Sequence, residues 1–321
     1  MGHAGFDGLV EFEATGLVEV ASGLQFPEGS VALDDGSVLL VEIERGTLSR
    51  VLPDGSVEVV ADLGGGPNGA AFGPDGRVYV CNNGGFFDYE RSSGIAIPHP
   101  DSAKWEKGSI QRVDPATGGS EVLYRDCNGQ PLLAPNDLVF DRHGGFWFTD
   151  HGVRSGDAAA GPAGAPSVLY STVDGSSIVG VLWGLDATNG IGLSPDGTRL
   201  YVAETYSGRL FSFEVTGPGE VAGSTLDDGR LLYDADGSAL FDSLAVAADG
   251  SVCVATLLTG GITVVPADGG VPSFLSTGDP LTTNICFGGS DGRTAFITCS
   301  GTGRLMRCTW PVAGADLAHR G

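Results

Sequence analysis

Residues 188–205 have the sequence TNGIGLSPDGTRLYVAET, in which two apolar runs flank an Asp-Gly pair. Asp-Gly between apolar runs is a strong signal for a β-hairpin, because glycine adopts positive φ at little cost. Asn189 opens the first run, eight residues before the turn glycine Gly197. The stretch predicts two antiparallel strands, with an oxygen-bearing side chain at the start of the first.

The same spacing occurs six times along the chain, which indicates a structural repeat. Each time an Asn, Asp or Glu stands eight residues before a glycine, and further strand-like runs follow each hairpin. The six pairs are Glu28 and Gly36, Asn68 and Gly76, Asn136 and Gly144, Asn189 and Gly197, Asp242 and Gly250, and Asn284 and Gly292. The repeating unit is therefore predicted to be a four-stranded antiparallel meander.

The length of the repeat predicts an all-β propeller. Successive units start roughly 40 to 68 residues apart, and the shorter separations match one propeller blade. We predict one domain spanning residues 1–321, a six-bladed β-propeller of four-stranded antiparallel blades. The last blade lacks a fourth strand near the C-terminus, and residues 16–23 are expected to supply it and to close the ring.

Charge and cysteine usage limit the partners and the location. The chain has 321 residues and a formal net charge of −23, from 40 acidic and 17 basic side chains. This charge repels phosphate backbones and anionic lipids, so we expect no nucleic-acid or membrane partner. No apolar run approaches the ~20 residues of a membrane helix, and the N-terminus shows no secretory signal. None of the six cysteines forms a C-x-x-C motif, which favours buried, reduced thiols and a cytoplasmic protein.

The topology of the repeat predicts which face carries a site. The oxygen-bearing residues open the inner strands, and the loop after each second strand lies on the same face. Two long insertions, residues 84–108 and 152–166, fall in such loops. They are expected to form a wall or lid for a substrate, although insertions also occur in loops without a function.

The six starting residues would bring only carboxylate and amide oxygens to the centre of the ring. Neither His nor Cys is among them, so the set suits a hard cation, with Ca²⁺ the first choice and Zn²⁺, Mg²⁺ or Mn²⁺ as alternatives. A simpler explanation is that Asn and Asp start strands because they favour turns. The occurrence at all six equivalent positions favours the site.

Several phrases resemble those of one known family. They are FPEG, PNG, PNDLVFD, TNGIGLSPDGTRLYVAET and DSLAVAADG. They resemble the senescence marker protein (regucalcin), gluconolactonase and luciferin-regenerating enzyme family, over about residues 17–310. The resemblance implies a six-bladed propeller with one divalent metal at its centre. By the same resemblance the metal ligands are Glu28, Asn136, Asn189 and Asp242.

The resemblance also implies a reaction, the metal-dependent hydrolysis of a small lactone by a gluconolactonase-like enzyme. Asp242 is then both a ligand and the candidate catalytic base. The family commonly has glycine after this Asp, whereas this chain has Ser243. In this respect it resembles the bacterial drug-responsive lactonases, and the resemblance implies that Ser243 is an additional contact in the site. The candidate substrate contacts are Asn68, Asn136, Asn284, His151 and Ser243.

Two other functions stay open at this point. The same metal site would also suit another electrophile, such as a phosphotriester, because a fold and a metal do not fix a substrate. A non-enzymatic propeller that only binds a ligand is the second alternative. The orientation of Asp137, toward the pocket or into the blade, is also open.

Overall fold

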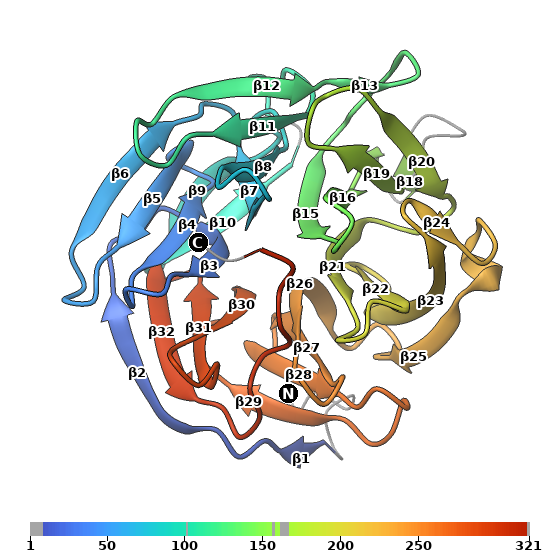
Figure 1. Cartoon of the computed structure of the whole chain (residues 1–321). Coiled ribbons are helices and arrows are strands. Elements are labelled where there is room, and N and C mark those ends of the chain that lie inside the picture. Colours follow the sequence, from blue (N-terminus) through green and yellow to red (C-terminus); the bar gives the residue numbers. More distant parts are fainter. Residues whose placement is uncertain (1–8, 101, 156–157, 161–166, 320–321) are drawn as a thin grey trace.

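The computed structural model describes residues 9–100, 102–155, 158–160 and 167–319. Within these ranges the strands form six antiparallel blades around a central axis (Figure 1). The helical content of the described residues is a single 3₁₀ turn, Leu226–Asp228. The predicted all-β, six-bladed propeller is confirmed.

Each blade is a meander whose strands follow one another from the axis outward. Blades one and two contain β3 (Pro27–Ala32), β4 (Val38–Glu42), β5 (Thr47–Val51) and β6 (Val57–Asp62), then β7 (Pro67–Phe72), β8 (Val78–Asn82), β11 (Ser109–Val113) and β12 (Ser120–Tyr124). Blades three and four contain β15 (Pro135–Phe140), β16 (Gly145–Asp150), β19 (Val168–Thr172) and β20 (Ile178–Leu182), then β21 (Thr188–Leu193), β22 (Arg199–Glu204), β23 (Arg209–Gly217), β24 (Glu220–Val221) and β25 (Arg230–Asp234). Blades five and six contain β26 (Leu240–Val246), β27 (Val252–Leu257), β28 (Gly261–Val265) and β29 (Ser273–Ser276), then β30 (Thr282–Gly288), β31 (Thr294–Cys299) and β32 (Arg304–Thr309).

The N-terminal segment contributes strands to two blades. β2 (Thr15–Ala21) pairs antiparallel with β32 and forms the outer strand of blade six, where residues 16–23 were expected. β1 (Val10–Glu11) pairs in parallel with β29 of blade five, which the sequence did not lead us to expect. How much the β2 pairing holds the ring together stays a prediction.

Every inner strand is irregular at the same level of the ring. The register with the second strand shifts at Glu28–Val31, Pro67–Ala70, Pro135–Leu138, Thr188–Ile191, Phe241–Leu244 and Thr282–Asn284. A bulge bends a strand and re-aims a side chain. In each blade the residue eight positions before the turn glycine lies within or at the end of this shift.

Neighbouring inner strands approach one another closely at the bulges. Each inner strand contacts the inner strands of both adjacent blades. A Cβ atom on Gly29 would lie 2.3 Å from the backbone oxygen of Asn68, and one on Gly69 would lie 2.6 Å from that of Asn136. Glycine is required there because a side chain would push the two strands apart.

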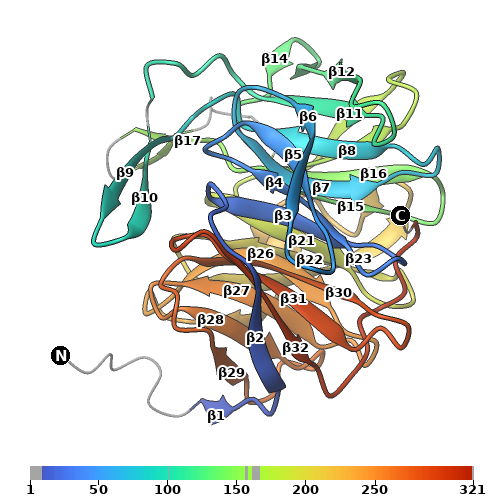
Figure 2. The same ribbon diagram turned by 90° about the vertical axis from the view of Figure 1, so that its left-hand side faces the viewer.

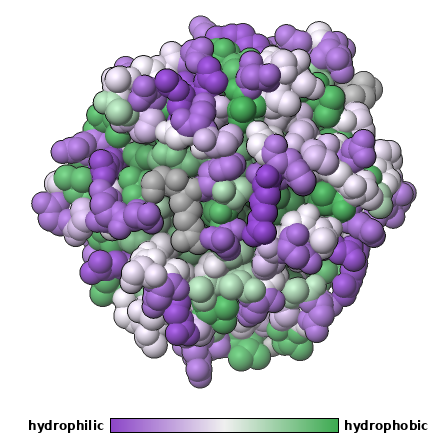
Figure 3. Space-filling model, viewed as in Figure 1, coloured by the Kyte–Doolittle hydropathy of each residue, from purple (hydrophilic) through white to green (hydrophobic). Residues whose placement is uncertain are grey.

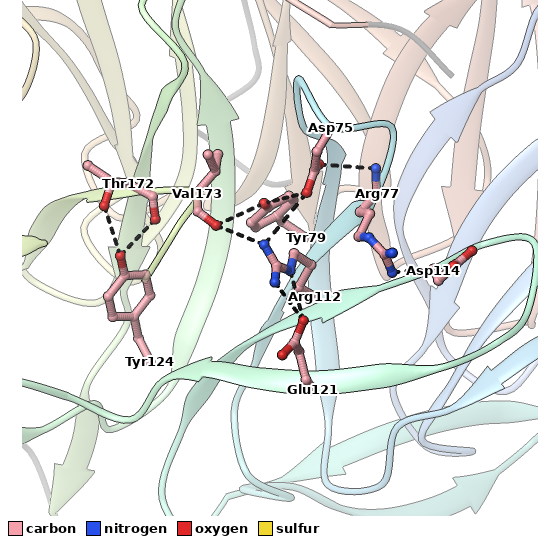
Figure 4. A network of polar contacts seen from close by, with 9 residues as sticks. All are labelled: Asp75, Arg77, Tyr79, Arg112, Asp114, Glu121, Tyr124, Thr172 and Val173. Carbon is pink, nitrogen blue, oxygen red and sulfur yellow. Dashed lines mark hydrogen bonds and ion pairs between the residues drawn. The ribbon is translucent and has the colours of Figure 1, made fainter. Parts of the chain in front are cut away.

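Polar contacts also join blades at their outer parts. Between blades two and three, Arg112 Nη1 donates a hydrogen bond to the Val173 carbonyl at 3.0 Å. The Tyr124 hydroxyl donates to the Thr172 carbonyl at 2.7 Å (Figure 4). It also lies 2.8 Å from the Ser177 carbonyl. The spaces between the sheets are otherwise filled by apolar side chains, such as the fully buried Trp147 and Phe146.

The ring has two different faces. The inner strands start, and the second strands end, on the face that carries the hairpin of β9 (Asp88–Ser92) and β10 (Ile95–His99), which projects from the ring (Figure 2). We call this the loop face. The insertion in blade three contains β17 (Val153–Ser155) and β18 (Ala158–Ala160), and the rest of its residues 156–157 and 161–166 lie outside the described residues. The short strands β13 (Asp126–Cys127) and β14 (Gln130–Pro131) form a further hairpin after blade two.

The opposite face carries the Asp-Gly turns, and we call it the turn face. The C-terminal segment crosses the axis on this side (Figure 1), with Gly314 paired to Ala247 and His319 against the ring of Phe140. Hydrophilic residues are spread over this face with small apolar areas between them (Figure 3).

All six cysteines are free thiols; five are buried and Cys286 is half-buried. The described residues include no helix with the length and apolar character of a membrane span.

Candidate metal centre

The residues at the six bulges meet around the axis. They are Glu28, Asn68, Asn136, Asn189, Asp242 and Asn284, one from each inner strand. All are buried except Asp242, which is half-buried. We call this set the oxygen ring. The structure thus brings together the six residues that the spacing in the sequence singled out.

Four members of the oxygen ring present an oxygen that has no hydrogen-bond partner. They are Glu28 Oε1, Asn68 Oδ1, Asn136 Oδ1 and Asn189 Oδ1, all buried. Buried acceptors in folded proteins are nearly always paired, because an unpaired one loses its hydration without compensation. Acceptor oxygens cannot pair with one another, but a cation could bind several of them at once.

Two contacts aim these oxygens. Glu28 Oε2 accepts hydrogen bonds from the Gly29 backbone and from Asn284 Nδ2, the latter at 2.8 Å, and this leaves Oε1 free. Asn284 Oδ1 in turn accepts from Ser30 Oγ at 3.1 Å. The described contacts of Asn284 therefore orient Glu28.

Asn189 is aimed in a similar way. Its Nδ2 atom donates to Thr205 Oγ1 at 3.1 Å, so its Oδ1 atom is turned away from that contact and is unpaired. The sequence analysis did not single out Thr205 or Ser30 as site residues. Thr205 ends the stretch 188–205, which also contains Asn189, and the hairpin predicted there is the one sequence signal that points to Thr205.

Three carboxyl groups share the centre of the ring. Burial, and then the charges of Asp242 and Asp137, raise the pKa of Glu28 well above its usual range. Burial raises the pKa of Asp242 to about 7; the adjacent Asn189 amide opposes this rise, and the charge of Asp137 adds to it. Without a cation these acids resist ionisation together, and a divalent cation would reverse that preference.

Asp137 lies at the axis rather than inside its blade. Its Oδ1 atom accepts a hydrogen bond from the Leu138 backbone at 2.8 Å and lies close to Gly69. Burial raises its pKa to about 7, and the nearby Ser243 hydroxyl is one of the groups that oppose the rise. Ser243 itself is fully buried. Asp137 also lines the central cavity described below.

The chemistry of the donor set fits a hard cation. Although Glu28, Asp137 and Asp242 influence one another electrostatically, the described residues contain no group of three or more His, Cys, Asp or Glu side chains that could hold a metal by themselves. The predicted ligands instead combine two carboxylates, Glu28 and Asp242, with two amides, Asn136 and Asn189. Oxygen donors of this kind suit Ca²⁺, which takes carboxylate, amide and water oxygens in flexible geometry.

The remaining predicted contact, His151, lies at the rim of the loop face. Its Nδ1 atom is 3.4 Å from the Gly152 carbonyl, and its ring meets Tyr206 edge-on with centroids 5.9 Å apart. Several aromatic residues of the insertion 84–108 pack on one another. Phe86 lies 5.0 Å from Phe87 and 5.6 Å from Trp105 between ring centroids.

A cavity of about 400 Å³ lies in the central channel on the turn side of the oxygen ring. Gly29, Asp137 and Asn284 line its inner end, and residues 314–319 line its mouth. The cavity therefore reaches the ring from the side opposite the long insertions. Between its inner end and its mouth, Val139, Leu193 and other inner-strand residues form a mainly apolar wall.

Comparisons with known proteins agree with this architecture. The family described as SMP-30/Gluconolactonase/LRE-like region matches residues 26–301. The gluconolactonase of Zymomonas mobilis is 27% identical over 313 residues, covering 89% of this chain and 80% of that protein. The lactonase drp35 of Staphylococcus epidermidis is 27% identical over 297 residues, covering 89% of this chain and 78% of that protein.

Solved structures share the fold. Regucalcin of Agrobacterium tumefaciens, described as a calcium-binding protein, has a TM-score of 0.74 at 18% identity, covering 97% of this chain and 99% of that one. A gluconolactonase of Xanthomonas campestris has a TM-score of 0.72 at 24% identity, covering 97% and 94%. At these identities the likeness shows the fold alone. With the family match spanning most of its length, the chain belongs to the SMP-30/gluconolactonase/LRE-like family.

Proposed function

We propose that this protein is a divalent-metal-dependent lactonase of the gluconolactonase type, with Ca²⁺ as the metal. The observation that carries the proposal is the set of unpaired buried oxygens beside Asp242. Support comes from relatives named gluconolactonase and lactonase and from the structural neighbour described as calcium-binding.

The proposed ligands are Glu28, Asn136, Asn189 and Asp242. Asn284 and Thr205 hold Glu28 and Asn189 in place through the contacts described above. A divalent cation held there would polarise the lactone carbonyl and favour charge on its oxygen. Two carboxylates balance the charge of such a cation, and the two amides add donors without further negative charge.

Asp242 is the proposed general base. It takes a proton from the attacking water as oxygen adds to the carbonyl carbon. The ring C–O bond then breaks, the leaving oxygen receives a proton, and a hydroxy acid results. Asn68 and Ser243 are proposed to contact hydroxyl groups of the substrate, and His151 to contact it from the rim. Asn284 is now proposed to orient Glu28 rather than to bind substrate.

The test is a hydrolysis panel with and without metal. Purified protein is treated with EDTA and assayed on a sugar lactone, an aliphatic lactone, an aromatic lactone and a phosphotriester, before and after Ca²⁺ is restored. We expect opening of at least one lactone that disappears with EDTA and returns with Ca²⁺. Glu28→Gln should lose most of the rate at limiting Ca²⁺, whereas Glu58→Gln, an exposed acid-to-amide change, should retain it.

Other outcomes would replace the proposal. Full lactone turnover after complete metal removal would contradict the metal dependence. Turnover of the phosphotriester alone would assign the same centre to a different electrophile. Binding of lactones without any turnover would favour a ligand-binding propeller.

A further inference from the structure

The β9–β10 hairpin is fixed over part of the ring by contacts to two other blades. It leaves blade two, yet Arg91 donates to both carboxylate oxygens of Glu44 in blade one, at 2.5 and 2.6 Å. On the other strand, the Ala96 backbone donates to the Gly301 carbonyl of blade six at 2.8 Å. Both contacts lie on the loop face, so the hairpin has a defined position beside the oxygen ring.

Tyr89 is the residue of this hairpin that faces the centre. Its ring packs on Phe26, with centroids 5.0 Å apart, and Phe26 precedes the proposed ligand Glu28 by two residues. Its hydroxyl group is buried and has no hydrogen-bond partner. Burial, followed by the charges of Glu44, Glu28 and Asp242, raises the pKa of Tyr89 well above its ordinary value. The group is therefore a neutral donor close to the acids of the site.

The needs of this hydroxyl complement those of the oxygen ring. The ring has unpaired acceptor oxygens, which a cation would neutralise, whereas the Tyr89 hydroxyl is an unpaired donor. No described protein group supplies that acceptor. A ligand that carries a polarised oxygen next to a bound cation would satisfy both. The carbonyl oxygen of a lactone, and a carboxylate oxygen of the opened product, have this chemistry.

We propose that Tyr89 is a further catalytic residue, whose hydroxyl donates a hydrogen bond to the carbonyl oxygen of the bound lactone. The inference rests on the proposed lactonase function. Negative charge grows on this oxygen when water adds to the carbonyl carbon, so the hydrogen bond is stronger in the transition state than in the ground state. Donors placed in this way commonly contribute about 10²–10³-fold to turnover.

Tyr89→Phe isolates the hydroxyl group. We expect kcat to fall about 10²-fold, with the affinity for Ca²⁺ unchanged. The melting temperature of the ligand-free protein should stay the same or rise, because the lost hydroxyl has no partner in the folded chain. The affinity for D-gluconate, an opened sugar lactone, should fall about tenfold in calorimetric titrations of the Ca²⁺-loaded protein.

Tyr124→Phe is the matched control. Its hydroxyl lies on β12, the outer strand of blade two, and donates to a backbone carbonyl of blade three. Its loss should lower the melting temperature and leave turnover and D-gluconate affinity unchanged. The two variants are thus expected to show opposite effects on stability and activity.

The outcomes separate this inference from the proposed function. Lactone turnover that is equal in Tyr89→Phe and the unmodified protein overturns the role of Tyr89 and leaves the lactonase standing. Binding of D-gluconate that weakens in the variant, in a protein that opens no lactone, supports the Tyr89 contact and overturns the reaction. A protein that neither opens lactones nor binds D-gluconate overturns both. A lower melting temperature together with lost Ca²⁺ affinity would assign Tyr89 a structural role and overturn the inference.

Discussion

Asp242 is proposed for two tasks, metal binding and proton transfer, and the first weakens the second. Both tasks begin with the ionised carboxylate, but a bound cation stabilises that form and so weakens its ability to accept a proton from water. Asp137 adds a second carboxyl group beside it, with a pKa raised by burial to about 7. The two carboxyl groups could divide metal binding and proton transfer between them. Substitution of Asp242 tests whether it performs both tasks.

Asp242→Asn keeps the size of the side chain and one oxygen donor but removes the proton acceptor. We expect turnover to fall about 10²–10⁴-fold even when the site is saturated with metal, the usual contribution of a general base. Asn189→Asp is the control, because it adds charge at the metal without removing a base. Metal content and turnover are measured together. Near-normal turnover of a fully metallated Asp242→Asn would leave Asp242 as a ligand only, with Asp137 the next base to test.

Sequence spacing predicted the residues of the ring but not their internal contacts. The spacing identified Glu28 and Asn284 because each stands at a fixed distance from a turn glycine. The hydrogen bond between them joins residues 256 positions apart. Such a contact leaves no local pattern, so the sequence could not show that Asn284 is hydrogen-bonded to Glu28 and Ser30.

At the scale of the strand, β2 completes blade six, a place that was predicted from the missing fourth strand of that blade. Its outward residues are exposed, whereas Leu17 packs against the core between blades five and six and Val20 packs against the core between blades six and one. Without it, the backbone groups of β32 would form an open edge.

Two truncations test this edge. Removal of residues 1–24 takes away both N-terminal strands, whereas removal of residues 1–14 takes away β1 and leaves β2. We expect the longer truncation to lower the melting temperature much more, because it alone exposes β32. Equal melting of the two truncated proteins, or of the longer truncation and the full chain, would show that β2 does not hold the ring together.

The hairpins were predictable because their signals are local. Asp-Gly turns between apolar runs identified the first two strands of each blade. The β9–β10 hairpin was expected only as a loop insertion, although Ser93 and Gly94, both with positive φ, form the kind of turn that joins two strands. The bulges were not foreseen, since they depend on the approach of the next blade, and the parallel pairing of β1 likewise depends on a distant strand.

At the scale of the whole molecule, a central cation would contact strands from four blades. Binding to the folded state alone adds RT ln(1 + [L]/Kd), about 2.7 kcal/mol at a hundredfold excess over Kd. For a chain of this size we expect Ca²⁺ to raise the melting temperature of EDTA-treated protein by roughly 4 °C. Glu28→Gln should reduce this response and Glu58→Gln should not. An unchanged melting temperature over a wide range of Ca²⁺ would contradict a central site.

The bulge that recurs in all six described inner strands has a consequence for how such a protein changes over generations. Each ring side chain projects from its own bulge, so a mutation there leaves the strand pairing of the other five blades untouched. The strand framework can therefore be kept while the ring side chains, and with them the reaction, change. Asn68, with an unpaired oxygen and no proposed metal bond, is the position where a new side chain would change ligand preference with the least disturbance. The repeated blades keep the fold constant while the side chains at its centre change.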